Sequence, residues 1–296
     1  MYNIVELFVQ KMIWGGQEMI RILVDSSADY TAEEAKKHNL ELVSINITLG
    51  GKNYLDGIDL TRDEFYDLLV SSEEFPMTAQ PSPQDFLDIF EDAKEKGDQL
   101  IYLSLSSGLS GTFQSATLAK SMAEYDDIYL VDTLSATRAI RLMAEYACKL
   151  RDEGNDAATI ASKLEEFKSR VVILAAVDTL EYLQKGGRLS KAAATVGELA
   201  NLKPLITVTE EGKIGVPGKA LGRNKAISTL VKMVTEKEID TTFPIYSIYS
   251  MGEENLDKFE LKLGKEGIRV TKRLQIGATI GSHIGPGAYG VIFVTK

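Results

Sequence analysis

The segment LSLSSGLSGTFQSA places serines and glycines between an apolar run and a helical pattern, as nucleophilic and anion-binding loops do. A hydrolase nucleophile elbow needs G-x-S-x-G, because glycines on both sides allow the strained turn that exposes the serine. In GLSG, residues 108–111, the second glycine comes one residue too early. The elbow spacing therefore fails. A catalytic triad is defined by arrangement rather than by chain order, so it stays open. Its members would be Ser110, His283 and an acid such as Asp25 or Asp132.

Phosphate and metal motifs fit less well. In GKIGVPGKALG, Gly212 lies one position too far upstream of Gly218-Lys219 for the Walker spacing, and Ala220 replaces the Ser or Thr that would bind magnesium. No G-x-G-x-x-G follows the first predicted strand. One cysteine and two histidines leave no ligand set for structural zinc and no disulfide framework. We therefore expect no ATP site, no metal and no cofactor of these kinds.

An anion-binding loop is the interpretation that survives for residues 106–112. They lie between a predicted strand and a predicted helix, so the loop amides and the first helical turn face one spot. The helix dipole and the orphan donors favour an anion there. The hydroxyls of Ser107, Ser110 and Thr112, around Gly111, can add side-chain donors. Simple helix capping by these hydroxyls is the alternative.

A second loop of the same character is FPMTAQPSP, in which Thr78 and Gln80 precede a proline segment. In an open α/β sheet, ligands bind beyond the carboxyl ends of the strands, where such loops gather. Together with His283, the two loops favour a shared anion site over capping alone.

The elements that must position these residues alternate between strand and helix from Ile20 onwards. Thr61 and Glu64 have capping-box spacing at the start of TRDEFYDLLVSS. The helix PSPQDFLDIFEDAKEKG has Ser82 as its N-cap and Gly97 past its end. Strands that alternate with helices of this length predict a parallel sheet with helices on both faces, which is a three-layer α/β/α domain.

The pattern changes after about Arg170, where strands, short helices and a hairpin turning at Glu211-Gly212 indicate a mixed α+β half. Met19 opens the first strand of the alternating pattern. We therefore predict an N-terminal extension over residues 1–18, an N-terminal α/β domain over 19–168 and a C-terminal α+β domain over 169–296.

Composition excludes several classes of partner. The formal net charge is -10 and no long Lys/Arg run occurs, which argues against nucleic acid. No apolar run reaches 18 residues, so no integral membrane segment is expected. Residues 1–18 carry charges inside their apolar pattern and lack a cleavage site, which argues against a signal peptide. Cys148 fits a buried helical position. These features predict a cytoplasmic protein.

Eight motifs follow one another between Met19 and Lys296: ILVDSSADYT, TAQPSPQDF, SSGLSGTFQSA, VDTLSA, LEYLQKGGRLSKAAA, LKPLITVTEEGKI, GRNKAI and IGSHIGPGAYG. In this order they resemble the DegV family, the fatty-acid-binding proteins that serve as lipid-carrying subunits of bacterial fatty acid kinase. Three departures stand out: Ala79 replaces a serine, and Arg138 and Arg141 occupy a helix start that is rich in glycine in the family.

The resemblance implies a two-domain fold with a long-chain fatty acid, of sixteen or eighteen carbons, buried between the domains. It implies that Thr78 and Ser110 bind the carboxylate and that His283 completes the head-group site. An ATP-dependent kinase subunit would be the partner and would form an acyl phosphate, so the chain itself is not expected to be an enzyme. Contacts with that partner or its phosphate are expected from Arg188, Lys191 and Arg223.

Burial of the tail would supply most of the affinity, at roughly 0.8 kcal/mol per CH2. Two hydroxyls and an imidazole should then suffice for the head group, without a buried Lys or Arg. Two other functions stay open: a Ser110-dependent lipid or ester hydrolase, and a lipid sensor or transporter without a kinase. Turnover of short esters would identify the first, and the absence of a nucleotide-binding partner would identify the second.

Overall fold

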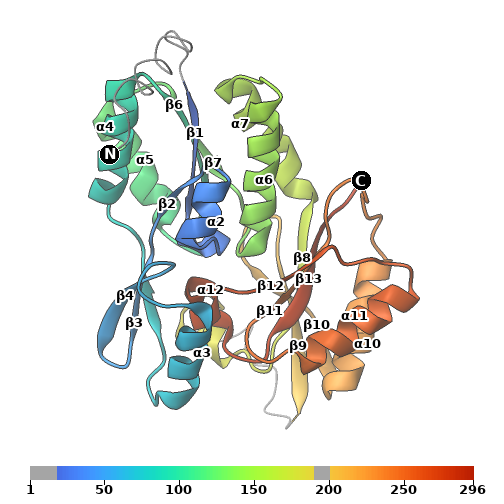
Figure 1. Ribbon diagram of the computed structural model, residues 1–296. Coiled ribbons are helices and arrows are strands. Elements are labelled where there is room, and N and C mark those ends of the chain that lie inside the picture. Colours follow the sequence, from blue (N-terminus) through green and yellow to red (C-terminus); the bar gives the residue numbers. More distant parts are fainter. Residues whose placement is uncertain (1–18, 190–200) are drawn as a thin grey trace, which may run out of the picture.

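The computed structural model describes residues 19–189 and 201–296 (Figure 1). Its first half contains a four-stranded sheet in the order β2-β1-β6-β7, with every neighbouring pair parallel. The register places Val24 opposite both Leu42 and Leu103. The strands are β1 (Ile20–Asp25), β2 (Glu41–Val43), β6 (Gln99–Ser104) and β7 (Ile128–Asp132). The parallel sheet predicted from the alternating pattern is confirmed.

Helices cover both faces of this sheet, as predicted. On one face, α4 and α5 bury an aromatic cluster of Phe86, Phe90 and Tyr102. On the other face lie α6 and α7, with α2 and the short turn η1 at the ends of the strands. The bounds are α4 (Pro83–Lys96), α5 (Thr112–Ala123), α6 (Arg138–Asp152), α7 (Ala157–Phe167), α2 (Ala32–Lys37) and η1 (Ser26–Ala28).

A small antiparallel sheet in the order β4-β3-β5 branches from this domain. Gly50 and Gly51 turn its hairpin with positive φ, where a side chain would be strained. The helix α3 follows, and Thr61 and Glu64 form the predicted capping box at its start. Ser82 likewise caps α4, which ends at Gly97 in the left-handed region. The bounds are β3 (Asn46–Leu49), β4 (Lys52–Leu55), β5 (Met77–Ala79) and α3 (Arg62–Ser71).

The second half forms a six-stranded sheet in the order β10-β9-β8-β13-β11-β12, which is antiparallel except for the β11–β12 pair. Helices α10 and α11 cover one face. The predicted mixed half is thereby confirmed. The bounds are β8 (Val171–Ala176), β9 (Leu202–Val208), β10 (Ile214–Leu221), β11 (Tyr246–Tyr249), β12 (Lys272–Gln275), β13 (Tyr289–Val294), α8 (Glu181–Lys185), α10 (Arg223–Thr235), α11 (Glu254–Lys265) and α12 (Ala278–Ile284).

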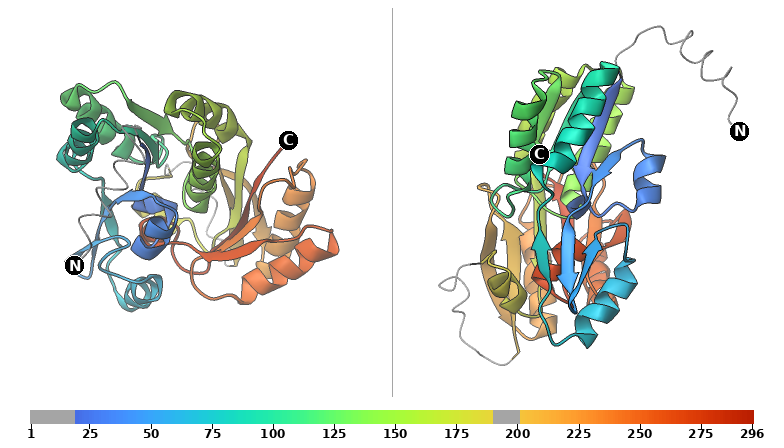
Figure 2. Two further views of the ribbon diagram at one scale, coloured as in Figure 1. Left: turned by 45° about the horizontal axis from the view of Figure 1, so that its top comes forward. Right: turned by 90° about the vertical axis from the view of Figure 1, so that its left-hand side faces the viewer.

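The other face of the six-stranded sheet packs on α6, so this helix lies between the two large sheets (Figures 1 and 2). One hydrophobic core therefore runs from β1 through α6 to β8 and β13. Helix α6 is buried on almost all sides, as expected for a helix between two sheets. Even Arg138 and Arg141 are buried, at 1% and 5% exposed. In the described part of the chain, no helix has both the length and the apolar character needed to cross a membrane.

Candidate ligand-binding site

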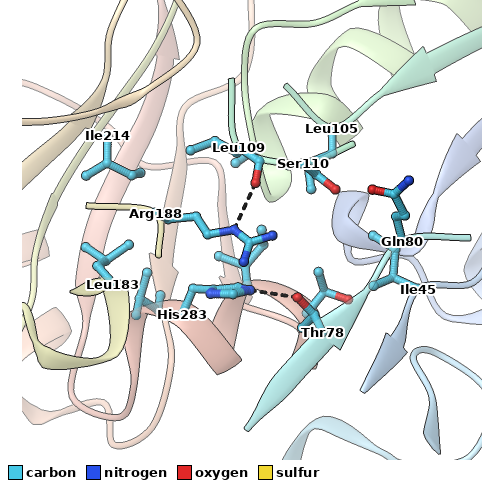
Figure 3. A pocket seen from close by; sticks show the side chains of 14 residues that line it. Ile45, Thr78, Gln80, Leu105, Leu109, Ser110, Leu183, Arg188, Ile214 and His283 are labelled. Carbon is cyan, nitrogen blue, oxygen red and sulfur yellow. Dashed lines mark hydrogen bonds between the residues drawn. The ribbon is translucent and has the colours of Figure 1, made fainter. Parts of the chain in front are cut away.

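A cavity lies where the loop of residues 106–112, here called the serine loop, meets strand β5, helix α12 and the end of α8 (Figure 3). One side of its wall is polar and the rest is apolar. Its volume is about 50 Å3. The lining residues are Ile45, Thr78, Gln80, Leu105, Leu109, Ser110, Ala136, Leu183, Arg188, Ile214, Thr279, Ile280, His283 and Ile284.

Thr78 and His283, which lie 205 positions apart in sequence, meet in this wall. Thr78 Oγ1 lies 2.8 Å from His283 Nε2 in a hydrogen bond. The other ring nitrogen, Nδ1, is buried without a hydrogen-bond partner and faces the Cα of Gly186, where a Cβ would collide with it. Burial, with the nearby charge of Arg188, lowers the pKa of His283 to about 4. The imidazole is therefore neutral at pH 7 and can exchange a hydrogen bond without carrying charge.

Ser110 reaches the same cavity from the loop before α5. Its Oγ lies 2.8 Å from Oγ1 of Thr112 and accepts a bond from the Thr112 amide at 3.3 Å. Thr112 itself is fully buried, and Ser107 is exposed and outside the cavity wall. Of the three hydroxyls in this predicted loop, only that of Ser110 lines the cavity.

Two buttressing carboxylates fix the shape of this loop. Asp25 Oδ2 accepts the Leu105 amide at 2.7 Å, and Asp132 Oδ1 accepts the Ser107 amide at 3.1 Å. His283 bonds Thr78 through Nε2 and has no hydrogen-bond partner at Nδ1, so neither acid is bonded to its ring. In this geometry Ser110, His283 and these acids do not form a triad.

Among the described residues that line the cavity, Arg188 is the one cation. Its Nε donates to the Leu109 carbonyl at 2.9 Å and its Nη1 to the Gly186 carbonyl at 2.6 Å. The guanidinium lies between Leu109 and the His283–Thr78 pair (Figure 3). Burial lowers its pKa, and no carboxylate among the described residues is recorded within ion-pair distance of it. A half-buried arginine therefore lies beside the expected head-group set of two hydroxyls and an imidazole.

Of the other two predicted cations, the structure describes only Arg223. Arg223 is the first residue of α10, is largely exposed, and approaches Asp178 at 3.6 Å. It is not part of the cavity wall. Lys191 lies outside the described residues. No group of three or more His, Cys, Asp or Glu side chains suited to a metal ion occurs in the described ranges 19–189 and 201–296.

The alternation of side chains along β5 explains the departure at Ala79. Thr78 and Gln80 face the cavity, whereas Ala79 is exposed and points away from it. Gln80 Nε2 donates to Ser115 Oγ at 2.9 Å, and its Oε1 lies against the Cα of Gly111, where any Cβ would collide with it. The missing serine hydroxyl at position 79 therefore removes nothing from the wall. Glycine at position 111 therefore leaves room for the Gln80 side chain.

The apolar wall was not predicted from the sequence. It comes from six separate segments, and each residue follows the ordinary apolar pattern of its own strand, loop or helix. No local motif distinguishes a leucine that faces a cavity from one that faces the core. The only indirect signal was that the polar residues recognised from their motifs converge on one place.

Fold and site together define a class: an α/β protein whose two halves enclose an apolar cavity with a polar, cationic end. Residues 19–296 match the family described as "Uncharacterised protein, DegV family". The chain belongs to the DegV family. It is 34% identical over 282 residues to a DegV domain-containing protein of Caldanaerobacter subterraneus subsp. tengcongensis, covering 94% of this chain and 100% of that protein.

Solved structures agree with this assignment. A DegV family protein from Thermus thermophilus, described by its fatty acid binding, superposes with a TM-score of 0.83 at 31% identity and covers 94% of this chain and 100% of its own. A stearic acid-binding protein from Eubacterium ventriosum gives a TM-score of 0.83 at 26% identity, with 94% of this chain and 99% of that chain covered. The chain is thus similar along nearly its whole length to proteins that bind fatty acids.

Proposed function

We propose that this protein binds one long-chain fatty acid in the cavity, with the carboxylate at Thr78, Ser110, His283 and Arg188. The observation that carries the proposal is the half-buried Arg188 guanidinium, which has no ion-pair partner among residues 19–189 and 201–296. It lies beside three hydrogen-bonding side chains at the polar end of an apolar cavity. Such a charge favours an anion, and apolar walls favour a hydrocarbon tail. The fatty acid binding of the structural relatives supports the same ligand class.

The head group and the tail would contribute differently. Each hydrogen bond to a carboxylate is worth about 1.5–3 kcal/mol, which sets orientation. A sixteen-carbon tail offers on the order of 10 kcal/mol before ordering costs, which sets affinity. A drug-sized or larger ligand needs roughly 300 Å3 or more. Because the cavity volume is only about 50 Å3, a whole tail would bind only if apolar walls such as Leu183, Ile214 and Ile284 moved apart.

We infer that the bound acid is then presented to an ATP-dependent kinase subunit in the cytoplasm, and that this chain retains the acyl phosphate without catalysing its formation. Arg188 is placed to neutralise a phosphate on the head group, since its Nη2 makes no recorded bond within the described chain. Exposed Arg223 suits a contact with the partner, and we assign Lys191 the same role from its motif.

The first test is native mass spectrometry of the freshly purified protein, together with mass spectrometry of its organic extract. We expect one fatty acid per chain. After delipidation, palmitate should bind to the wild type and bind more weakly to Thr78→Val and Ser110→Ala. Ser107→Ala is the matched control, because that hydroxyl lies outside the cavity wall. A chain that carries no fatty acid and takes up no palmitate would contradict the proposal.

The alternatives have their own outcomes. Turnover of short p-nitrophenyl esters that disappears in Ser110→Ala would identify a hydrolase. Fatty acid binding without acyl phosphate formation by any nucleotide-binding protein of the same cell would identify a sensor or transporter. With a functional kinase, Arg223→Ala should reduce acyl phosphate formation while palmitate still binds.

A further inference from the structure

Helix α12 carries His283, and the contacts that fix this helix come largely from the N-terminal half of the chain. It has seven residues, and its N-cap, Gly277, makes no side-chain capping bond. A helix of this length is marginal by itself, so its place depends on tertiary contacts. Those contacts include α3, β3 and η1 on one side and α8 on the other.

Asp56 supplies the missing cap from another segment. Its Oδ2 accepts the Thr279 hydroxyl at 2.5 Å and the Thr279 amide at 3.3 Å, across 223 residues of sequence. Asp56 is 7% exposed. A carboxylate that accepts a first-turn amide satisfies an orphan donor of the helix and interacts favourably with its dipole. The start of α12 is therefore attached to the loop after β4.

Tyr66 holds the chain just before the helix. Its hydroxyl donates to the Ile276 carbonyl at 3.0 Å, and both residues are buried. Its ring also packs directly on the helix: a Cβ added to Gly281 would lie 2.7 Å from Tyr66 Oη and 2.7 Å from Phe65 Cε1. Helix α3 and helix α12 thus approach as closely as a glycine allows.

Arg138 holds the preceding residue from the opposite side. Its Nη2 donates to the Gln275 carbonyl at 2.7 Å, and its Nη1 donates to the Asp29 carbonyl at 2.5 Å. The side chain is 1% exposed, so both bonds are shielded from water. Arg138 therefore links the end of β12 to the turn after η1.

We propose that Asp56, Tyr66 and Arg138 are positioning residues that hold α12 so that His283 Nε2 reaches Thr78. These three residues, here called the anchors, bond to residues 275, 276 and 279. His283 follows Thr279 by four positions and so lies on the same face of the helix. A displacement at the anchored end is therefore carried to the imidazole. The effect of these anchors on ligand binding rests on the proposed function. Their effect on the position of His283 does not.

The test measures the titration of the His283 imidazole by NMR. The chain has only two histidines, so histidine-selective isotope labelling gives two sets of NMR signals, and His38→Gln assigns them. In the wild type, the His283 signal should stay that of a neutral ring until the pH falls to about 4. The groups that face it are Arg188, Thr78 and Gly186.

Tyr66→Phe and Asp56→Asn should each loosen α12 and admit water to the ring. Because burial is the main cause of the low pKa, we expect the apparent pKa of His283 to rise by about one pH unit or more. Matched controls are Tyr125→Phe, which also loses a tyrosine bond to a carbonyl, and Asp156→Asn, which also loses a helix-capping carboxylate, because both lie away from α12. Neither control should shift the His283 titration.

A folded Tyr66→Phe and a folded Asp56→Asn that both titrate like the wild type would overturn the proposal. Where Asp56→Asn does not fold, Tyr66→Phe and two variants of Thr279 test the proposal instead. Thr279→Val removes the hydroxyl donor and should raise the pKa of His283. Thr279→Ser retains that donor and should keep the wild-type titration. Palmitate binding is measured on the same samples and should weaken about tenfold in the anchor variants. A wild type that binds no palmitate would refute the proposed function while the histidine titration still decides the positioning roles.

Discussion

At the scale of single residues, the charge of Arg188 sets the character of the cavity. Its guanidinium is held by two backbone carbonyls, of Leu109 and Gly186, which compete little with an incoming anion for its charge. The neighbouring His283 is neutral because that charge and burial both lower its pKa. A carboxylate in the cavity would thus meet one cation and several neutral donors, which favours an anionic head group over a neutral one.

This predicts a selective effect of Arg188→Met. Palmitate affinity should fall about 10- to 100-fold, because a charged hydrogen bond worth roughly 1.5–3 kcal/mol is lost. Binding of hexadecanol, which has the same tail and no charge, should change little. Isothermal titration calorimetry with both ligands measures the difference, and Arg223→Met is the control for loss of a surface cation. Equal losses for the two ligands would show that Arg188 acts through packing alone.

At the scale of elements, the serine loop is fastened to the hairpin between β9 and β10. Ser106 Oγ donates to the Gly212 carbonyl at 2.7 Å. A Cβ at position 108 would lie 2.7 Å from that carbonyl oxygen and 2.9 Å from the carbonyl oxygen of Glu211, so Gly108 is required by contact with the hairpin. Ile214, which follows the turn, is part of the cavity wall. The loop that carries Ser110 is therefore in direct contact with the hairpin that carries Ile214.

Gly108→Ala should displace the hairpin and lower the free energy of unfolding by about 1–3 kcal/mol, the usual cost of overpacking. Palmitate binding should weaken with it, because Ser110 and Ile214 shift. Gly264→Ala in α11 is the control: nothing lies within 4 Å of its added Cβ, so helix propensity alone acts and should add up to about 1 kcal/mol. Urea unfolding of both variants checks this. A Gly108→Ala protein as stable as the wild type would show that the contact is not tight in solution.

These contacts also show where sequence reasoning stops. The capping box at Thr61 and the N-cap at Ser82 were predictable because their partners lie three residues away. The four-stranded parallel sheet was predictable from the alternation of strands and helices. The hydrogen bonds between Asp56 and Thr279 and between Ser106 and Gly212 join segments more than 100 residues apart, and no local sequence pattern predicts them. The residues of the polar end were recognisable from their motifs, whereas the place of Arg188 inside the wall came only from the fold.

At the scale of the whole molecule, helix α6 lies between the two large sheets and ties them together with buried charge. Arg138 bonds to Asp29 on one side and Gln275 on the other. Arg141 pairs with Glu34 at 2.9 Å, and it also pairs with Glu145. Removing one partner of such a buried set leaves the other uncompensated, which is costly. The arginines at this helix start therefore fill the space between the sheets, and neither of them lines the cavity.

Two buried groups, His283 and Asp56, make the stability of the fold depend on pH in opposite directions. His283 has a pKa of about 4 in the folded chain against 6.5 when exposed, so the unfolded chain binds a proton first and stability falls as the pH drops from 6.5 to 4. Asp56 has a pKa of about 6 against 3.8, mainly because of burial, so the folded chain binds its proton first and stability rises as the pH drops from 6 to 3.8.

Each effect amounts to roughly 3 kcal/mol over its range, so the two nearly cancel in the wild type. His283→Gln removes only the first. We therefore expect this variant to gain stability relative to the wild type as the pH falls from 6.5 to 4, at up to about 1.4 kcal/mol per pH unit. Urea unfolding at half-unit steps of pH measures the difference. Parallel curves for variant and wild type would mean that His283 titrates in the folded chain as it does when exposed, and that water reaches the polar end of the cavity freely.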